Sequence, residues 1–355
     1  MPEYTVLIHP ETIGRTEEYL DALRSGSAPG ELLRTRLQGI SLGDIALSQF
    51  IEHLVRTKKP QIYAETAVVG DGSDWSQMEL SILGDISVAV PVTIYDNGLH
   101  RSPPVYGQTF GGMLLFTPGA LLRNGRGRTP ADWDEVVGNG CIDQRLFSAL
   151  YLRRLLPPLL FASRTAINSG RKAFVTIPGL GCGQFAGPFL GQVGPYLDTA
   201  LSELLQIHHA DLPGIQAVYF DPYSECENQR TKIGHIDYMV RPLTRGNGQK
   251  PQLCMPIHYA DSGDEFSDCD LYSVVAWDHV SWPGNDFYGG SRATDDGVKA
   301  AATNSMAILT GVEGKYDAAV CKYLPPNEHR NWEEVIEVKK VDLEVEHNIQ
   351  ILPEI

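Results

Sequence analysis

Apolar positions follow two different periods along the chain. Within the first sixty residues they recur every three or four positions over residues 17–23 and 45–54, which predicts two amphipathic helices. A Gly/Ser segment at residues 25–30 lies between them and is typical of a loop. From about Ile62 onward, short β-branched and apolar runs alternate with longer helical patterns. Strands that alternate with helices indicate an α/β sheet covered by helices on both faces.

The remaining predicted helices and strands follow from the same hydrophobic periods. The predicted strands are residues 86–95, 113–117, 173–177, 217–220, 235–240, 253–258 and 271–277. The predicted helices are residues 143–167, 189–207 and 298–309, and the first is expected to be interrupted at Pro157-Pro158. No internal repeat is present. Because the pattern changes near Ile62, we predict an N-terminal helical extension over residues 1–60 and one larger domain over residues 61–355.

The formal net charge of −15 narrows the classes of partner. A strongly acidic surface repels phosphate backbones, so we expect no nucleic-acid partner. A small anionic ligand stays compatible with this charge, because backbone N–H groups and helix N-termini hold phosphates without Lys or Arg. The 355 residues are 43% hydrophobic, which is enough for one large core.

Cysteine spacing and hydropathy indicate where the protein resides. The six cysteines include no CxxC pair, and His208-His209 has no neighbours at zinc-ligand spacing. We therefore expect free thiols in a reducing compartment and no metal site. Residues 1–4 lack the basic and apolar regions of a signal peptide. The most apolar stretch, residues 155–162, contains Pro157-Pro158 and is too short to cross a bilayer. These features predict a soluble cytoplasmic protein without a membrane span.

A glycine-rich loop follows the predicted strand at residues 173–177. It runs from Pro178 to Gly187 and holds four glycines, which let the backbone turn sharply and approach a ligand closely. With Pro188 in the first turn of the next helix, the loop amides and the helix N-terminus would form a cradle for phosphate or pyrophosphate. The residues predicted to contact such a group are Gly179, Gly181, Cys182, Gly183, Gln184 and Phe185.

The glycine-rich loop has three other interpretations besides a phosphate cradle. The loop lacks the GxxxxGK[ST] pattern, so no lysine would reach a γ-phosphate and an ATPase is a weak match. Its GxGxxxG spacing differs from the dinucleotide pattern GxGxxG, which makes a Rossmann site a poor match. A glycine-rich turn without any ligand stays open.

An acidic loop follows the predicted strand that ends at Trp277. Loops at the carboxyl ends of strands are where α/β sheets bind ligands. Thr294 is a credible N-cap for the helix that follows. Clustered carboxylates can hold ribose hydroxyls, activate a water molecule and stabilise a developing oxocarbenium charge. The polar residues of this loop that we expect to act on a ligand are Asp278, Asn285, Asp286, Asp295 and Asp296.

Each of these residues also has a purely structural interpretation. Asp295 and Asp296 would suit the first turn of a helix, where they balance its dipole. Asn285 and Asp286 are common in turns, and Asp278 fits a solvated strand end. A metal site built from these carboxylates is a further alternative. Taken together, the cluster favours a functional site.

The residues around the acidic loop resemble a known family. Residues 282–288 (WPGNDFY) and 292–303 (RATDDGVKAAAT) are similar to the atypical macrodomain of the MavL effector family. The resemblance is specific over residues 277–303 and plausible over the glycine-rich loop at residues 179–187. Residues 1–60 contain no motif that we can place in that family.

The resemblance implies a fold, an activity and a set of site residues. The fold would be a three-layer α/β/α macrodomain-like mixed sheet. The activity would be a hydrolase reaction that removes mono-ADP-ribose from arginine on ADP-ribosylated ubiquitin, without metal or cofactor. The aspartates that this family needs for activity correspond to Asp278, Asp286 and Asp296. Phe287 or Tyr288 would stack on a base or a ribose.

A second stretch carries a weaker resemblance. Residues 84–87 (GDIS), followed by Asn97, are similar to the GDI(T)…N segment that opens many macrodomains. By that resemblance Asp85 would receive the adenine amino group and Asn97 would lie near the distal ribose. An ordinary loop-to-strand turn is an equally good interpretation. Residues 111–113 (GGM) lack the paired glutamates of poly-ADP-ribose glycohydrolases, which favours a mono-ADP-ribose substrate.

These features combine into one predicted reaction, hydrolysis at the anomeric carbon of the distal ribose. The glycine-rich loop would bind the pyrophosphate, while Asp286 and Asp296 hold the ribose and activate water. Asp278 would support them or contact the leaving guanidinium. A non-catalytic ADP-ribose reader, a metal-dependent nucleotide phosphoesterase and a pure interaction scaffold stay open as alternatives. The expected location is the cytosol, including that of a host cell if the protein is secreted as an effector.

Overall fold

A single mixed sheet organises the molecule. The computed structural model describes residues 3–62, 73–125 and 127–354. Within them a nine-stranded sheet has the order β13-β1-β2-β3-β10-β6-β7-β9-β8. In that order the strands are β13 (Ile349–Ile351), β1 (Thr5–Ile8), β2 (Ile86–Asp96), β3 (Val105–Pro118), β10 (Cys269–Trp277), β6 (Lys172–Pro178), β7 (Ile215–Asp221), β9 (Ile236–Val240) and β8 (Gln229–Ile233).

Strand direction decides where ligand-binding loops can gather. The neighbouring strands β3, β10, β6, β7 and β9 run parallel, whereas β2 is antiparallel to both β1 and β3. The carboxyl ends of the five parallel strands therefore share one edge of the sheet, which we call the carboxyl edge. Because β2 runs the other way, it begins at this edge and ends at the opposite one.

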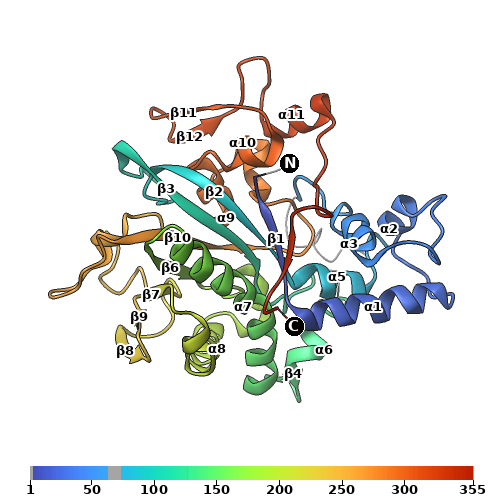
Figure 1. The fold of residues 1–355 in the computed structure, drawn as a ribbon, viewed down its shortest axis with the longest axis horizontal. Helices are drawn as coiled ribbons and strands as arrows, with labels where there is room; N and C mark the ends of the chain where they lie inside the picture. The colour runs from blue at the N-terminus through green and yellow to red at the C-terminus, as the bar shows by residue number, and fades with distance from the viewer. Residues whose placement is uncertain (1–2, 63–72, 126, 355) are drawn as a thin grey trace.

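Helices cover both faces of the sheet. Figure 1 shows α7 and α8 on one face, α9 and α10 on the other, and the N-terminal helices beside the sheet. The helices are α1 (Pro10–Arg24), α2 (Glu31–Arg36), α3 (Leu47–Val55), α5 (Gln77–Gly84), α6 (Trp133–Val136), α7 (Gln144–Asn168), α8 (Val193–His208), α9 (Asp295–Ala301), α10 (Ser305–Thr310) and α11 (Trp332–Lys339). Two small hairpins, β4 (Val137–Gly138) with β5 (Cys141–Ile142) and β11 (Lys315–Asp317) with β12 (Lys322–Leu324), complete the described elements.

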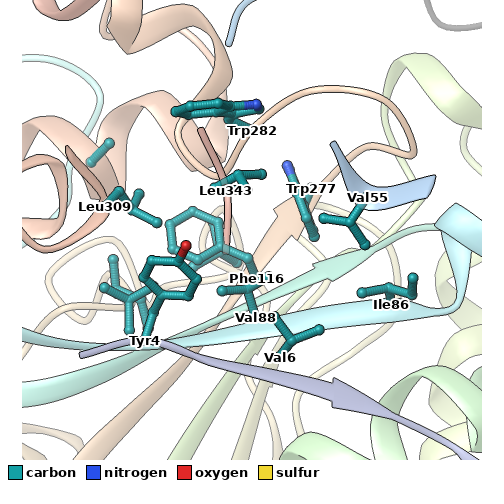
Figure 2. Close-up of a cluster of buried hydrophobic side chains, with 14 of the residues drawn as sticks. Tyr4, Val6, Val55, Ile86, Val88, Phe116, Trp277, Trp282, Leu309 and Leu343 are labelled. Carbon is teal, nitrogen blue, oxygen red and sulfur yellow. The ribbon is translucent and has the colours of Figure 1, made fainter. Parts of the chain in front are cut away.

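The sheet separates two hydrophobic cores because successive side chains of a strand point to opposite faces. On β3, Leu114 and Phe116 enter one core, and Leu115 enters the other. The core that contains Phe116 also contains Trp277 and Trp282 from the acidic loop and its strand (Figure 2). The second core lies under α7 and α8. The sheet is therefore buried on both faces, as the predicted three-layer α/β/α arrangement requires.

Most predicted elements are present, with three corrections. Helix α7 continues through Pro157 and Pro158, which are both buried, so packing compensates for the lost helical hydrogen bonds. Residues 253–258 do not form a strand, because they lead into a 3₁₀ turn at Pro256–Tyr259. The helix predicted at residues 298–309 is two short helices, α9 and α10, separated at residues 302–304.

The start of the chain is more than a helical extension. The helices predicted at residues 17–23 and 45–54 are present as parts of α1 and α3, but the pattern gave no sign of β1, which lies between β13 and β2. Leu20 and Phe50 of these helices belong to the same core as Phe116. A division of the chain at residue 60 stays a prediction. Across the described ranges, no helix has the length and apolar character needed to span a membrane.

Candidate functional site

Two loops that lie far apart in the sequence meet at the carboxyl edge. We call residues 179–187, which follow β6, the glycine loop, and residues 278–296, which follow β10, the acidic loop. The Phe185 ring lies edge-on to the His279 ring, with 6.4 Å between centroids. Between them runs the segment after β3, where Gly119 N donates to Trp277 O at 3.3 Å and Leu122 N donates to Phe185 O at 2.8 Å. One ligand could therefore contact both loops.

Two glycines of the glycine loop are required by its close packing. Gly181 has φ of +75° and Gly187 has φ of +55°, a region that favours glycine. A Cβ on Gly187 would lie 2.4 Å from Leu122 O, and one on Gly181 would lie 2.9 Å from Ala120 O. Among the described residues, the amides of Gly181 and Gly183 have no hydrogen-bond acceptor. These amides are the groups that could receive a phosphate oxygen.

The expected helix N-terminus does not stand directly behind the glycine loop. A 3₁₀ turn, η1 (Gln184–Phe189), contains Pro188, and α8 begins only at Val193. The first turn of α8 is already occupied, because Gly194 N donates to the Glu225 carboxylate at 2.5 Å. The prediction that the α8 dipole supports a bound phosphate was therefore wrong. Leu190, which falls within the helix predicted at residues 189–207, precedes α8 and is 66% exposed.

The side chains of the glycine loop differ in their access to a ligand. Cys182 is buried, and burial raises the pKa of its thiol well above its usual value. The Gln184 Oε1 atom accepts from Arg123 Nη1 at 2.7 Å on the exposed side of the loop. Phe185 is half-buried against His279. A ligand at this loop would thus meet backbone amides more readily than the Cys182 thiol.

Asp286 is held by three donors at the start of α9. Its Oδ2 accepts from the backbone N–H groups of Ala293 and Thr294, both at 3.1 Å, and its Oδ1 accepts from Thr294 Oγ1 at 2.8 Å. The carboxylate lies directly over Gly297, where an added Cβ would be 1.6 Å from Asp286 Oδ1. These hydrogen bonds and the close packing against Gly297 fix the position of the Asp286 carboxylate.

Asp296 has a different environment, although it lies next to Asp286. It is only 3% exposed, and its Oδ1 lies 2.5 Å from Thr294 Oγ1 and 2.8 Å from Gly297 N. Burial raises the pKa of Asp296 well above its usual value, and the negative charges of Asp286, Asp278 and Asp295 add to the effect. Two adjacent carboxyl groups, one of which is buried and has a raised pKa, are suited to general acid–base catalysis.

Asp278 is engaged mainly with its own loop. Its Oδ1 accepts from Val280 N and Ser281 N, both at 2.7 Å, and its Oδ2 accepts from the Ser281 hydroxyl. Behind it the buried Lys58 Nζ donates to His279 O at 2.6 Å and lies 4.0 Å from the centroid of the Trp277 ring. Burial lowers the pKa of Lys58 to about 7, against the opposing effect of Asp278. Asp278 therefore fixes the shape of the acidic loop.

The remaining predicted residues of the acidic loop have structural partners. Asp295 Oδ2 accepts from Ala276 N at 2.8 Å and from Lys299 Nζ at 3.0 Å, which fixes α9 to β10. Asn285 Oδ1 accepts from Ile62 N at 2.8 Å. The residues predicted to stack on a base or a ribose, Phe287 and Tyr288, are 1% and 0% exposed in the hydrophobic core. Neither ring is placed to stack on a ligand.

The two polar residues of the GDI…N segment, Asp85 and Asn97, lie far from each other. They flank β2, an uninterrupted strand of eleven residues, and at about 3.3 Å per residue its two ends lie roughly 35 Å apart. Asn97 follows Asp96, whose carboxylate accepts from Arg292 of the acidic loop at 2.8 and 2.7 Å, so the acidic loop also reaches this end of β2. Asp85 is at the carboxyl edge, but its buried carboxylate is paired with Arg15, Arg153 and Arg154. The ligand contacts that the GDI…N resemblance implies for Asp85 and Asn97 stay a prediction.

The sequence interpretation missed several residues that support the site. Lys58 contacts the acidic loop from outside it, and Thr294, which was expected only as an N-cap, also donates to Asp286. Below the loop, Asp132 pairs with Arg154 at 2.7 Å and with His279 Nε2 at 3.2 Å. The only sequence signal for these groups was the position of His279 beside Asp278. Their partners come from distant elements, so spacing could not reveal them.

Neither of the two best-formed cavities in the described structure coincides with these loops. One of about 520 Å³ opens near Gly112 and Leu271, at the edge opposite the carboxyl edge. Another, of about 370 Å³, lies among the N-terminal helices near His53. In the described ranges, no group of three or more His, Cys, Asp or Glu side chains is placed to hold a metal ion. The candidate site is therefore defined by its polar groups.

Comparison with known protein families decides the relationship that the loops suggest. A family model described as macrodomain effector MavL matches residues 4–329. The chain belongs to this MavL family. Its nine-stranded mixed sheet with helices on both faces is accordingly a macrodomain fold. Membership of the MavL family associates the chain with ADP-ribose, as a ligand or a substrate. No curated protein matches the chain.

Proposed function

We propose that this protein is a hydrolase that removes mono-ADP-ribose from arginine residues of ADP-ribosylated ubiquitin. The observation that supports the proposal most directly is the pair Asp286 and Asp296, which share the Thr294 hydroxyl beside a glycine loop with free amides. A module that only binds ADP-ribose needs the amides, but it does not need two adjacent carboxyl groups. The pair therefore favours an enzyme over a reader.

The two loops divide the ligand between them in this proposal. The amides of Gly181 and Gly183 receive the pyrophosphate oxygens, and the acidic loop surrounds the distal ribose. Backbone amides suit a chain with a net charge of −15, because they bind an anion without a cationic side chain. Asp85, Asn97, Phe287 and Tyr288 have no role in this arrangement.

The chemistry follows from the two aspartates. Asp286, with three hydrogen-bond donors, accepts a proton from water as the water attacks the anomeric carbon. Asp296 carries a proton and gives it to the departing guanidine nitrogen. The negative charge of Asp286 also stabilises the oxocarbenium-like transition state of glycosidic cleavage. Asp278 keeps the loop in shape through Val280 and Ser281.

The test measures ADP-ribose release from ubiquitin that carries ADP-ribose on arginine. Asp286→Asn and Asp296→Asn preserve side-chain size, and each should slow release by roughly 10²–10⁴-fold, the range of general acid–base catalysis. Asp268→Asn, at an exposed position near the start of β10, is the control that should keep wild-type activity. Wild-type rates in both site variants would reject the catalytic roles.

Binding and chelation experiments separate the other functions. A reader would show an ADP-ribose-dependent thermal shift but no release from modified ubiquitin, and an interaction scaffold would show neither. A metal-dependent phosphoesterase would lose its activity after exhaustive chelation, whereas the proposed reaction should survive it. The family description as an effector supports action in the cytosol of a host cell, which detection of the protein in host fractions would test.

A further inference from the structure

Thr294 lies between the two aspartates in a way that fixes the number of protons they share. Its Oγ1 is 2.8 Å from Asp286 Oδ1 and 2.5 Å from Asp296 Oδ1. A hydroxyl has a single proton and can donate to only one of these oxygens. The Gly297 N–H, 3.3 Å away, points to the Thr294 oxygen as an additional donor. The second short contact therefore requires a proton from one of the carboxyl groups.

The surroundings identify the carboxyl group that carries this proton. Asp286 accepts two further backbone N–H groups, whereas the other hydrogen bond to Asp296 is a single N–H from Gly297. Asp296 is also the more buried of the two. The ionisable groups that act on Asp296 or are acted on by it are Asp278 after β10, Asp286 and Tyr288 in η4 (Asn285–Gly289), and Asp295 and Lys299 in α9.

We propose that the Thr294 hydroxyl relays a proton from Asp286 back to Asp296 in every catalytic cycle. In the resting site Asp296 donates to Thr294 Oγ1, and Thr294 donates to the Asp286 carboxylate. Thr294 is thus a positioning and relay residue that acts through the two aspartates. This inference rests on the hydrolase reaction proposed above.

The proton balance of the cycle is complete. As water attacks, one water O–H bond breaks and Asp286 takes the proton, while the C–N bond breaks and the Asp296 proton goes to the guanidine nitrogen. The products are ADP-ribose and arginine, and the site now holds a protonated Asp286 and an ionised Asp296. The Asp286 proton then moves to Thr294 Oγ1 as the Thr294 proton moves to Asp296, which restores the resting state.

The relay explains how a buried acid regains its proton. Asp296 is 3% exposed, so direct exchange with bulk water is restricted. Asp286 is half-buried and adjacent to exposed backbone at Ala293 and Thr294. Because one hydroxyl oxygen contacts both carboxyl groups, the proton transfer needs no movement of the acidic loop.

The experiment compares Thr294→Val with Thr294→Ser in the full-length protein. Valine has the shape of threonine but no hydroxyl, and serine keeps the hydroxyl. We expect Thr294→Val to lower kcat for release from arginine-modified ubiquitin by roughly 10²-fold and to change its pH profile, with Thr294→Ser retaining most of the rate. Thr294 also caps α9, so Asn331→Ala, which removes the cap of α11, controls for cap loss and should leave the rate unchanged.

A second readout does not depend on activity. Carbon-13 NMR of aspartate carboxyl groups should show Asp296 and Asp286 titrating as a coupled pair in the wild type and separately in Thr294→Val. An active wild type whose Thr294→Val variant keeps the same rate and pH profile would overturn the relay. Independent titration of both aspartates in the wild type would overturn it too. If the wild type releases no ADP-ribose, the hydrolase proposal fails, and the NMR titration still decides whether the proton is shared.

Discussion

At the scale of single residues, the position of Asp286 depends on the absence of a side chain at Gly297. An added Cβ would lie 1.6 Å from Asp286 Oδ1, so Gly297→Ala must displace the carboxylate. We expect ADP-ribose release to fall by roughly 10²-fold. The thermal stability should not fall together with the rate of ADP-ribose release, because Ala is a better helix former than Gly by about 1 kcal/mol.

A second glycine provides the control for this substitution. Gly14 lies within α1, and a Cβ there would meet nothing within 4 Å. Gly14→Ala should raise the unfolding temperature slightly and leave ADP-ribose release unchanged. Full activity in Gly297→Ala would show that Asp286 does not need its observed position.

Lys58 gives a prediction about stability and pH. Its pKa is lowered from 10.5 to about 7 by burial, so the unfolded chain binds this proton more tightly than the folded chain. The free energy of unfolding should therefore rise with pH between about 7 and 10.5, and this contribution is lost as pH falls through that window. The wild type minus Lys58→Met difference, measured by urea unfolding at several pH values, should show the rise.

The neighbouring Lys59 is a matched control for Lys58. Its side chain is 44% exposed and pairs with Asp74 at 2.8 Å. Lys59→Met, measured in the same way, controls for the loss of one lysine from this segment. A flat profile for Lys58→Met would mean that the Lys58 ammonium is not desolvated in the folded protein.

At the scale of elements, the glycine loop depends on its packing against the segment after β3. Gly187 and Gly191 both have positive φ, of +55° and +82°, but only a Cβ on Gly187 would collide with a backbone atom, Leu122 O. Gly187→Ala should shift the loop and weaken ADP-ribose binding by at least about tenfold, or roughly 1.4 kcal/mol. Calorimetric titration with ADP-ribose would measure the change.

Gly191→Ala separates backbone strain from collision. It introduces a left-handed alanine at a cost of about 1–2 kcal/mol of stability, with no atom within 4 Å of the new Cβ. Its affinity for ADP-ribose should stay close to that of the wild type. Equal losses in the two variants would indicate that strain, and not the contact with Leu122, sets the position of the loop.

At the scale of the whole molecule, the N-terminal segment belongs to both the sheet and the site. Strand β1 pairs with β2 and β13, and Lys58 and Lys59 contact the acidic loop. A chain that begins at residue 61 should therefore lose cooperative thermal unfolding and ADP-ribose binding. Calorimetry of the two chains would test this, and native-like unfolding of the shortened chain would mean that residues 1–60 are a dispensable extension.

The sequence predicted the layered α/β architecture because burial on both faces leaves continuous apolar runs in the strands and apolar stripes on the helices. It also identified the glycine loop and the acidic loop, since each follows an apolar run that ends at the carboxyl edge. Strand β1 was not predicted, because a run of four residues is too short to show a clear hydrophobic period. The double proline in α7 was misjudged because local propensity weighs less than packing in a core.

What the sequence determined alone was local: which residues turn, which are buried and which carboxylates lie near one another along the chain. Only the tertiary structure decided which of these groups act together. It separated Asp85 from Asn97 by a full strand, buried Phe287 and Tyr288, and brought Lys58 beneath Asp278. Periodicity specifies the face on which a side chain lies, but the partners of that side chain depend on strand order, which distant pairings establish.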